Sequence, residues 1–420
     1  MPTTLRPDSR RSFLRQLGGG LGLLPVTTAL SGAAGRQSAA GSWDAVRTQF
    51  PFTESMVPMN AGNLCPSPRQ VTERLNDLNG RIEVDVSHGH RDGFRALIEA
   101  SRTMVAEHIG ADPEEVALVR NTTEANAAII GGLPLEAGDE VVLWSENHPT
   151  NNVAWEVQAA RADLRIKRVA TPPNTWSRDR LVELFTEAIG PRTRALALTH
   201  VSNTSGLVLP IQAIAEVARQ RGVFVHVDGA QSWGALRIDV RTLGCDSFSA
   251  SCHKWLCGPK EAGLLFARRD QIERVWAHTV GFGWGTNVDP LPAGARKFEA
   301  LGQRDDGRLA VIADTIDFHR ELGESRIEAR VRTLASALKR GLRDAGLPVA
   351  TPDDARLSAG VVLVPVPEVR RREVVATLER DHGIAGSRAG GLHLSPHLYN
   401  TIEHVERAVT GVAALRDRLG

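Results

Sequence analysis

The feature that most constrains the fold is an alternation of short β-rich runs with helical stretches between residues 93 and 268. Many of the runs are apolar on both faces and are separated by helical patterns, which is typical of a largely parallel sheet covered on both sides. The sequence therefore predicts a doubly wound α/β domain. The predicted strands are 116–119, 140–143, 164–169, 195–199, 223–227, 247–251 and 263–266.

The length of the chain predicts a second, smaller domain, because 420 residues exceed what a single core usually accommodates. A Gly-rich segment follows the sheet, and then a helical pattern runs over 309–342 with a break near Gly323. A strand at 360–364 and a helix at 373–382 come next. These patterns indicate a small α+β domain after the linker helix.

The predicted boundaries place an N-terminal arm at 41–70, a large domain at 71–290 and the small C-terminal domain at 291–420. The arm is rich in Pro, Asn and Gly between residues 43 and 68. This composition is typical of a loop-rich extension, so we expect an arm and not a core element.

The first forty residues differ in character from the rest. Arg10 and Arg11 stand between Ser9 and Ser12-Phe13-Leu14, ahead of a weakly apolar stretch. This pattern resembles a twin-arginine export signal, and the apolar stretch is too short to span a bilayer. We predict a signal at 1–40, transient contact with the twin-arginine translocase, cleavage between residues 33 and 40, and a periplasmic or secreted protein without a stable membrane anchor. The alternative is a disordered basic tail.

Charge and cysteine content exclude some classes of function. The formal net charge is +1 with no long run of like charge, so neither nucleic acid nor an anionic surface is an expected partner. The four cysteines form no pair of CxxC units, and the histidines show no helix-face pair, so we expect neither a disulfide framework nor a metal site. His226 alternates with apolar residues and is interpreted as a core histidine.

The strongest chemical signal is Lys254, which follows the predicted strand 247–251 and stands between His253 and Trp255. A lysine at the mouth of an α/β sheet is partly desolvated, which lowers the pKa of its amine and lets it attack a carbonyl near neutral pH. This chemistry predicts a Schiff base between Lys254 and pyridoxal phosphate.

Asp228 supplies the second signal, because the β-run 223–227 delivers it to the carboxyl end of a strand, where ligands bind in open α/β sheets. A carboxylate there can keep a pyridinium nitrogen protonated, which makes the pyridoxal ring an electron sink. At about 3 Å and an effective dielectric near 20, the attraction is roughly 5 kcal/mol. Asp228 alone would more often be a turn-forming or capping residue.

With these motifs in order, the chain after residue 40 resembles the class V aminotransferase superfamily of fold-type I pyridoxal-phosphate enzymes, which includes cysteine desulfurases and isopenicillin N epimerases. The resemblance implies a mostly parallel seven-stranded sheet sandwiched by helices, a small C-terminal domain, an amino-acid substrate and a homodimer.

The resemblance also implies residue roles. Thr122 and Thr123 would meet the cofactor phosphate at a helix N-terminus, with Ser251 and His253. His148 would stack on the ring, and Asn203 and Gln231 would contact its 3-oxygen. The remaining roles are Arg388 for the substrate carboxylate, Asn63 and Tyr399 for further substrate contacts, and Thr286 for the phosphate in the partner subunit.

One departure bears on the reaction. Cysteine desulfurases need a catalytic thiolate in the C-terminal half, and this chain has no cysteine beyond Cys257. We therefore favour an isopenicillin N epimerase-like enzyme in which Lys254 acts on the Cα proton. A C–S lyase, an aminotransferase and a non-catalytic pyridoxal-phosphate-binding protein remain alternatives. A serine hydrolase is disfavoured because no Gly-x-Ser-x-Gly motif is present.

Overall fold

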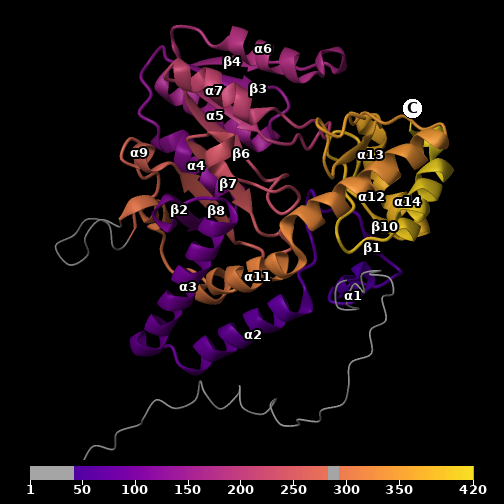
Figure 1. The fold of residues 1–420 in the computed structure, drawn as a ribbon, viewed down its shortest axis with the longest axis horizontal. Coiled ribbons are helices and arrows are strands. Elements are labelled where there is room, and N and C mark those ends of the chain that lie inside the picture. The colour runs from indigo at the N-terminus through magenta and orange to yellow at the C-terminus, as the bar shows by residue number, and fades with distance from the viewer. Residues whose placement is uncertain (1–41, 282–292, 420) are drawn as a thin grey trace, which may run out of the picture. The chain divides into compact units, whose positions relative to one another are not determined.

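A seven-stranded sheet in the order β2-β8-β7-β6-β5-β3-β4 forms the main element of the fold (Figure 1). The computed structural model describes residues 42–281 and 293–419. β8 is antiparallel to β2 and β7, whereas every other adjacent pair is parallel, so the predicted mostly parallel sheet is confirmed. The strands are β2 (Val116–Val119), β3 (Glu140–Trp144), β4 (Arg165–Val169), β5 (Thr193–Thr199), β6 (Phe224–Asp228), β7 (Ser247–Ser251) and β8 (Gly263–Ala267).

Alternate strand residues enter two different hydrophobic clusters, one on each face of the sheet. Val142 and Leu196 belong to one cluster, and Val141 and Ala195 belong to the other. Because side chains alternate along a strand, both faces must be covered by helices. The covering helices are α3 (His88–His108), α4 (Thr122–Gly132), α5 (Pro149–Ala162), α6 (Arg178–Ala188) and α7 (Ile211–Gln220), with the short α8 (Val240–Leu243) and α9 (Arg269–Ile272).

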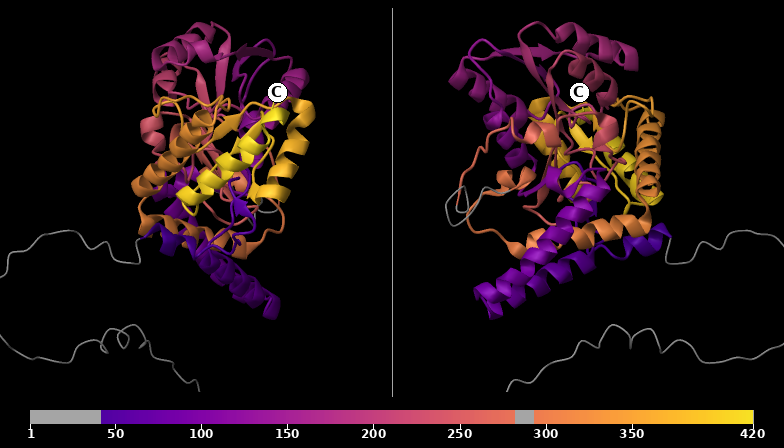
Figure 2. Two further views of the ribbon diagram at one scale, coloured as in Figure 1. Left: turned by 90° about the vertical axis from the view of Figure 1, so that its right-hand side faces the viewer. Right: turned by 60° about the vertical axis from the view of Figure 1, so that its left-hand side comes forward.

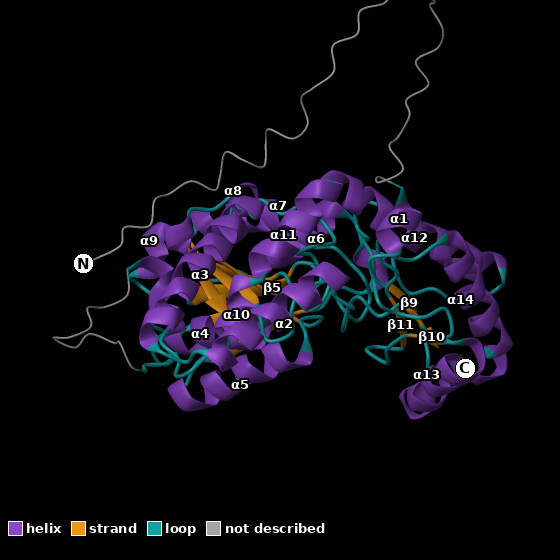
Figure 3. Cartoon of the chain, turned by 90° about the horizontal axis from the view of Figure 1, so that it is seen from below, coloured by secondary structure: helices purple, strands orange, loops and turns teal. Residues whose placement is uncertain are grey.

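The C-terminal part has its own hydrophobic cluster and two small sheets (Figure 3). β9 (Val362–Val364) pairs antiparallel with β11 (Leu392–Leu394), and β10 (Ile384–Ala385) pairs parallel with β1 (Val57–Pro58). The predicted boundary at residue 290 lies outside the described residues. The α-helices after residue 293 are α10 (Asp306–Ala310), α11 (Ile312–Leu322), α12 (Glu324–Asp344), α13 (Glu368–His382) and α14 (Ile402–Ala414). Side chains of α10, α11 and the first half of α12 belong to a hydrophobic cluster of the large sheet, and α12 contributes to the C-terminal cluster from Leu334 onward.

The predicted break near Gly323 is present. Gly323 lies between α11 and α12 with φ +84°, a conformation that glycine adopts without steric cost. α11 also packs along α3, and α2 (Arg69–Val84) runs beside them (Figure 2). None of the helices in the described part of the chain has the length and apolar character that a membrane crossing requires.

The N-terminal arm differs from its prediction. It contains the short helix α1 (Trp43–Arg47), and Val46, Phe50 and Met59 are buried. The reason is tertiary: β1 pairs with β10, and the ring of Phe50 packs 4.9 Å from that of Tyr399. A segment rich in Pro and Gly can thus be irregular in backbone and still contribute side chains to the core.

Candidate functional site

A cavity of about 280 Å³ opens where the carboxyl ends of the central strands meet the first turn of α4. Ligands bind at this position in open α/β sheets, because the strand ends and helix N-termini converge there. Ten of the thirteen predicted site residues line the cavity, so the structure brings them together. They are Asn63, Thr122, Thr123, His148, Asn203, Asp228, Gln231, Ser251, His253 and Lys254.

Lys254 lies three residues after the end of β7 and lines the cavity. Burial lowers the pKa of its amine, and the negative charge of Asp228 partly opposes that shift. Its amine has no hydrogen bond or ion pair within residues 42–281 and 293–419. The amine is therefore easier to deprotonate than an exposed lysine and is available to a ligand.

Asp228 is the last residue of β6 and is almost fully buried. Its Oδ1 accepts a hydrogen bond from the Ala230 amide at 3.0 Å, and its Oδ2 accepts one from Nδ2 of Asn126 at 2.9 Å. Sequence reasoning missed Asn126. The available signal was its spacing, because Asn126 lies four residues after Thr122 and therefore on the same face of α4.

The first turn of α4 is built to receive an anion. Asn121 caps the helix by accepting a hydrogen bond from the Glu124 amide at 3.0 Å. The Ser251 hydroxyl lies 2.8 Å from the Thr122 amide and 2.7 Å from its hydroxyl. The positive end of the helix dipole attracts phosphate, the hydroxyls of Thr122 and Ser251 can contact it, and Thr123 and His253 complete this end of the cavity.

These residues fit pyridoxal phosphate. The cofactor requires an amine for its carbonyl, a carboxylate for its ring nitrogen and an anion site for its phosphate, and the cavity presents all three. Asn203 Oδ1 and Thr199 Oγ1 are also buried without a hydrogen-bond partner. Buried polar atoms are seldom left unpaired, so these two atoms indicate a polar ligand.

Gln231 lines the cavity with its hydrogen bonds already engaged by protein. Its Nε2 donates to the Gly62 carbonyl at 2.7 Å, and its Oε1 accepts from Nε1 of Trp255 at 2.8 Å. Trp255 follows Lys254 in the chain. The observed role of Gln231 is therefore to connect the arm with the loop that carries the lysine, and its predicted contact with the 3-oxygen stays a prediction.

His148 caps α5, where its Nδ1 lies 2.7 Å from the Thr150 hydroxyl. Burial lowers the pKa of His148, as does the nearby Lys254, while Asp228 opposes the shift. A neutral imidazole is therefore expected at physiological pH, which suits stacking against an aromatic ring. Burial also lowers the pKa of His253 to about 4.

Of the three remaining predicted residues, Thr286 lies outside the described residues, and Arg388 and Tyr399 do not line the cavity. Arg388 is exposed, and its guanidinium has no partner in the described part of the chain. Its loop lies close to the site, because a Cβ added to Gly390 would come within 2.9 Å of the carbonyl oxygen of Thr204, the neighbour of Asn203.

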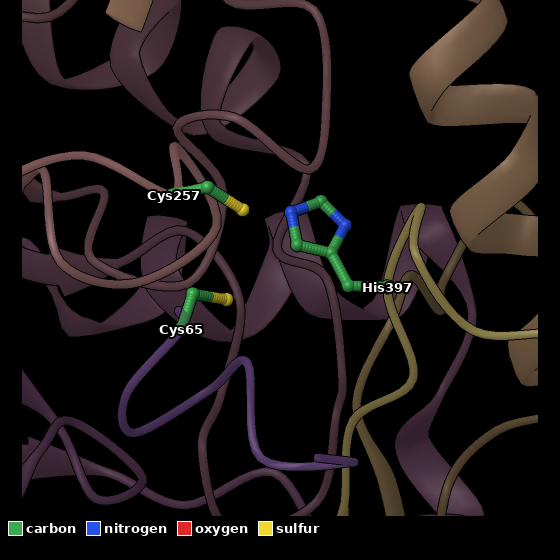
Figure 4. Close-up of side chains that lie close together, drawn as sticks. All are labelled: Cys65, Cys257 and His397. Atoms are coloured by element: carbon green, nitrogen blue, oxygen red, sulfur yellow. The ribbon is translucent and has the colours of Figure 1, made fainter. Parts of the chain in front are cut away.

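Tyr399 is fully buried beside a group of sulfur and imidazole side chains, away from the cavity lining. Its hydroxyl is 3.4 Å from Sγ of Cys65. The side chains of Cys65, Cys257 and His397 lie close together (Figure 4). Nε2 of His397 donates a hydrogen bond to the Trp255 carbonyl at 2.6 Å, whereas its Nδ1 is buried without a hydrogen-bond partner among the described residues. The predicted substrate contact of Tyr399 has no support in this placement.

Comparison with known proteins agrees with this geometry. The family model for aminotransferase class-V matches residues 65–412. Isopenicillin N epimerase of Streptomyces clavuligerus is 30% identical over 401 residues, which cover 90% of this chain and 99% of that protein. A probable cysteine desulfurase of Halalkalibacterium halodurans is 30% identical over 394 residues, covering 87% and 94%. C-DES with glycine covalently linked to its PLP cofactor has the same fold, with a TM-score of 0.81, 23% identity and coverage of 87% and 98%.

Proposed function

Because the chain belongs to the aminotransferase class-V family of pyridoxal-phosphate-dependent enzymes, we propose that it epimerises the α-carbon of an amino acid. One observation carries this proposal: the amine of Lys254, the carboxylate of Asp228 and the anion site of α4 line one cavity, and no cysteine lines it. All four cysteines are buried, and none lines the cavity. A persulfide-forming reaction needs an accessible thiolate, whereas proton transfer at Cα needs only a base.

Lys254 is the residue that moves the proton. Burial lowers the pKa of its amine, so this amine reaches the neutral form that accepts the α-proton more easily than an exposed lysine does. Pyridoxal phosphate, when bound, supplies the ring that takes up the electron pair left at Cα. Asp228 holds a proton at the ring nitrogen, and the free guanidinium of Arg388 suits a bidentate pair with the substrate carboxylate.

The epimerase of Streptomyces clavuligerus aligns over 99% of its length, and the probable cysteine desulfurase of Halalkalibacterium halodurans aligns over 94% of its length at the same identity. The preference for epimerisation over desulfuration therefore rests on the absence of a cysteine from the cavity lining. β-Elimination from a sulfur-containing amino acid and transamination start from the same proton transfer. They are the outcomes that the following experiment separates.

The test is to incubate the enzyme with separate L- and D-amino acids in deuterated water. Epimerisation predicts the opposite enantiomer with deuterium at Cα and no pyruvate, sulfide or keto acid. Lys254→Ala should lose this activity and the visible band of the lysine-bound cofactor, whereas Lys260→Ala, an exposed lysine of the same loop, should keep both. Pyruvate and sulfide as the main products would identify a lyase, and keto acid formation would identify a transaminase. A wild type that shows no such band after incubation with pyridoxal phosphate contradicts the proposal.

We also propose that the active form is a homodimer. Trp276 and Val280 are 72% and 59% exposed, and this pair of apolar side chains, four residues apart, suits contact with a partner subunit. Light scattering of the purified holoenzyme should give twice the chain mass, and Trp276→Glu should weaken the association. A monomer that binds the cofactor fully contradicts this proposal.

Export through the twin-arginine translocase is a further proposal, supported by Arg10 and Arg11 within the pattern of residues 9–15. The expected location is the periplasm or the medium. Changing both arginines to lysine should retain the folded, cofactor-loaded protein in the cytoplasm, as cell fractionation would show. Unchanged export of the double variant contradicts the proposal.

A further inference from the structure

A buried chain of hydrogen bonds connects Asp228 to the interior of the sheet. Nδ2 of Asn126 donates to Asp228 Oδ2 at 2.9 Å. Oδ1 of the same amide lies 2.9 Å from Nε2 of His226 and 2.6 Å from the Ser249 hydroxyl. Nδ1 of His226 lies 2.7 Å from the Ser247 hydroxyl. All five side chains are buried, and they come from α4, β6 and β7.

The charge of Asp228 fixes the direction of every bond in this chain. An ionised carboxylate can only accept, so the Asn126 amide must turn its NH₂ group toward Asp228. Its oxygen then faces His226 and Ser249, and both must donate to it. Burial lowers the pKa of His226 to about 4, so the ring is neutral and carries its single proton on Nε2. Nδ1 is left as an acceptor, and Ser247 donates to it.

This arrangement leaves Asp228 with one orientation. Its two oxygens accept from the Ala230 amide and from Asn126, and the reversed amide would place an oxygen against the carboxylate. A fully satisfied polar network in a low-dielectric interior is rigid, whereas one reversed member leaves several groups unpaired. The strands therefore hold Asp228 through Asn126 as well as through its own backbone.

We propose that Asn126 is a positioning residue: it fixes the Asp228 carboxylate for the cofactor ring nitrogen and is itself fixed by His226, Ser247 and Ser249. The inference rests on the proposed role of Asp228 at the ring nitrogen. Although Asn126 also lines the cavity, the inference predicts that loss of its amide acts through Asp228 and weakens the hold on the proton of the ring nitrogen.

The first test uses the wild-type holoenzyme with ¹⁵N-labelled histidine. Long-range ¹H–¹⁵N spectra distinguish the two neutral tautomers of an imidazole from each other and from the charged ring. The resonance of His226, assigned by its loss in His226→Gln, should show a proton on Nε2 only. A proton on Nδ1 alone, or a charged ring, overturns the inference, because the Asn126 amide would then have no reason to face Asp228 with its NH₂ group.

The second test compares Asn126→Ala with Asp228→Ala, using pyridoxal phosphate labelled with ¹⁵N in the ring. Asn126→Ala should move the ring ¹⁵N signal part of the way that Asp228→Ala moves it. It should also raise the Kd for pyridoxal phosphate roughly ten- to a hundredfold, the range expected for one hydrogen bond to a charged group, with the amino-acid KM little changed. If Asn126→Ala does not fold, Asn126→Ser serves instead, because its shorter hydroxyl cannot reach both Asp228 and His226.

Ser101→Ala is the matched control, because it removes a buried hydrogen bond to the Ala310 carbonyl at a site that does not line the cavity. It should leave both readouts unchanged. If Asp228→Ala shifts the ring signal and Asn126→Ala does not, the positioning role is wrong. If Asp228→Ala itself leaves the signal unchanged, the proposed role of Asp228 fails instead, so the two failures are distinguishable.

Discussion

Gly234 offers a sharp test of how the lysine loop is held. Its φ of +89° lies in the left-handed region, and an added Cβ would come within 2.4 Å of the Leu256 amide nitrogen and 2.5 Å of the Trp255 carbonyl carbon. Both atoms belong to the backbone that follows Lys254. The indole of Trp255 is fully buried and donates a hydrogen bond to Gln231, so the loop cannot shift away from an added Cβ without disturbing the core.

The expected cost of Gly234→Ala has two parts. A left-handed conformation costs an alanine roughly 1–2 kcal/mol, and overpacking of a dense interior adds about 1–3 kcal/mol. The sum is roughly 2–5 kcal/mol. Gly222→Ala isolates the first part, because Gly222 has φ +68° and nothing lies within 4 Å of an added Cβ.

Urea unfolding of the two apo variants, monitored by circular dichroism, measures these costs. Gly234→Ala should lose more stability than Gly222→Ala and should also bind pyridoxal phosphate more weakly, because a displaced backbone moves Lys254. Equal losses in the two variants, with normal cofactor binding in both, would refute the packing argument and show that the Lys254 loop yields easily.

Three further outcomes are expected. Asp228→Asn should lower the pKa of the Lys254 amine below its wild-type value, because it removes the negative charge that opposes the effect of burial. The rate of pyridoxal phosphate capture, measured by stopped-flow absorbance, should then reach its plateau at a lower pH than in wild type. A plateau at a higher pH contradicts the assignment. Ser251→Ala should cost about 1–2 kcal/mol of unfolding free energy and weaken cofactor binding, because the Thr122 amide loses its acceptor; unchanged urea midpoints would show that water replaces it. Tyr399→Phe should change the free energy of unfolding by less than about 1 kcal/mol, because its hydroxyl contacts only a weak partner, Sγ of Cys65, among the described residues. It should leave the amino-acid KM unchanged, and a tenfold rise in KM would support the predicted substrate contact of Tyr399.

Strand positions and strand-end residues could be predicted because they depend on local pattern. The predicted strand bounds deviate from the observed ones by at most two residues, as for β5 at Thr193–Thr199 against 195–199. Asp228 ends β6 and Lys254 follows the neighbouring strand β7, so parallel pairing alone brings them to one edge of the sheet. The same logic places Asn203 and Thr122 at that edge, after β5 and β2.

Residues whose place depends on tertiary contacts could not be predicted in this way. Tyr399 stands in a tail segment that resembles the family's substrate region, yet its ring packs against Phe50 of the arm, whose burial the composition did not indicate. Arg388 lies on a loop that approaches the site through Gly390, a contact visible only once the C-terminal part is folded.

The role of Asn126 could be predicted only in part from the sequence. Its helical spacing from Thr122 gives a face of α4, but the same spacing would fit a buried asparagine with any partner. Its role follows from three elements at once, because the carboxylate on β6, the hydroxyl on β7 and the neutral imidazole of His226 together leave the amide a single orientation. His226 was predicted to be a core histidine, and the structure agrees, since it is fully buried and bonded on both nitrogens. His226 is therefore a core residue that also bears on the site. A proton on its Nε2 favours the orientation of the Asn126 amide in which the NH₂ group faces Asp228.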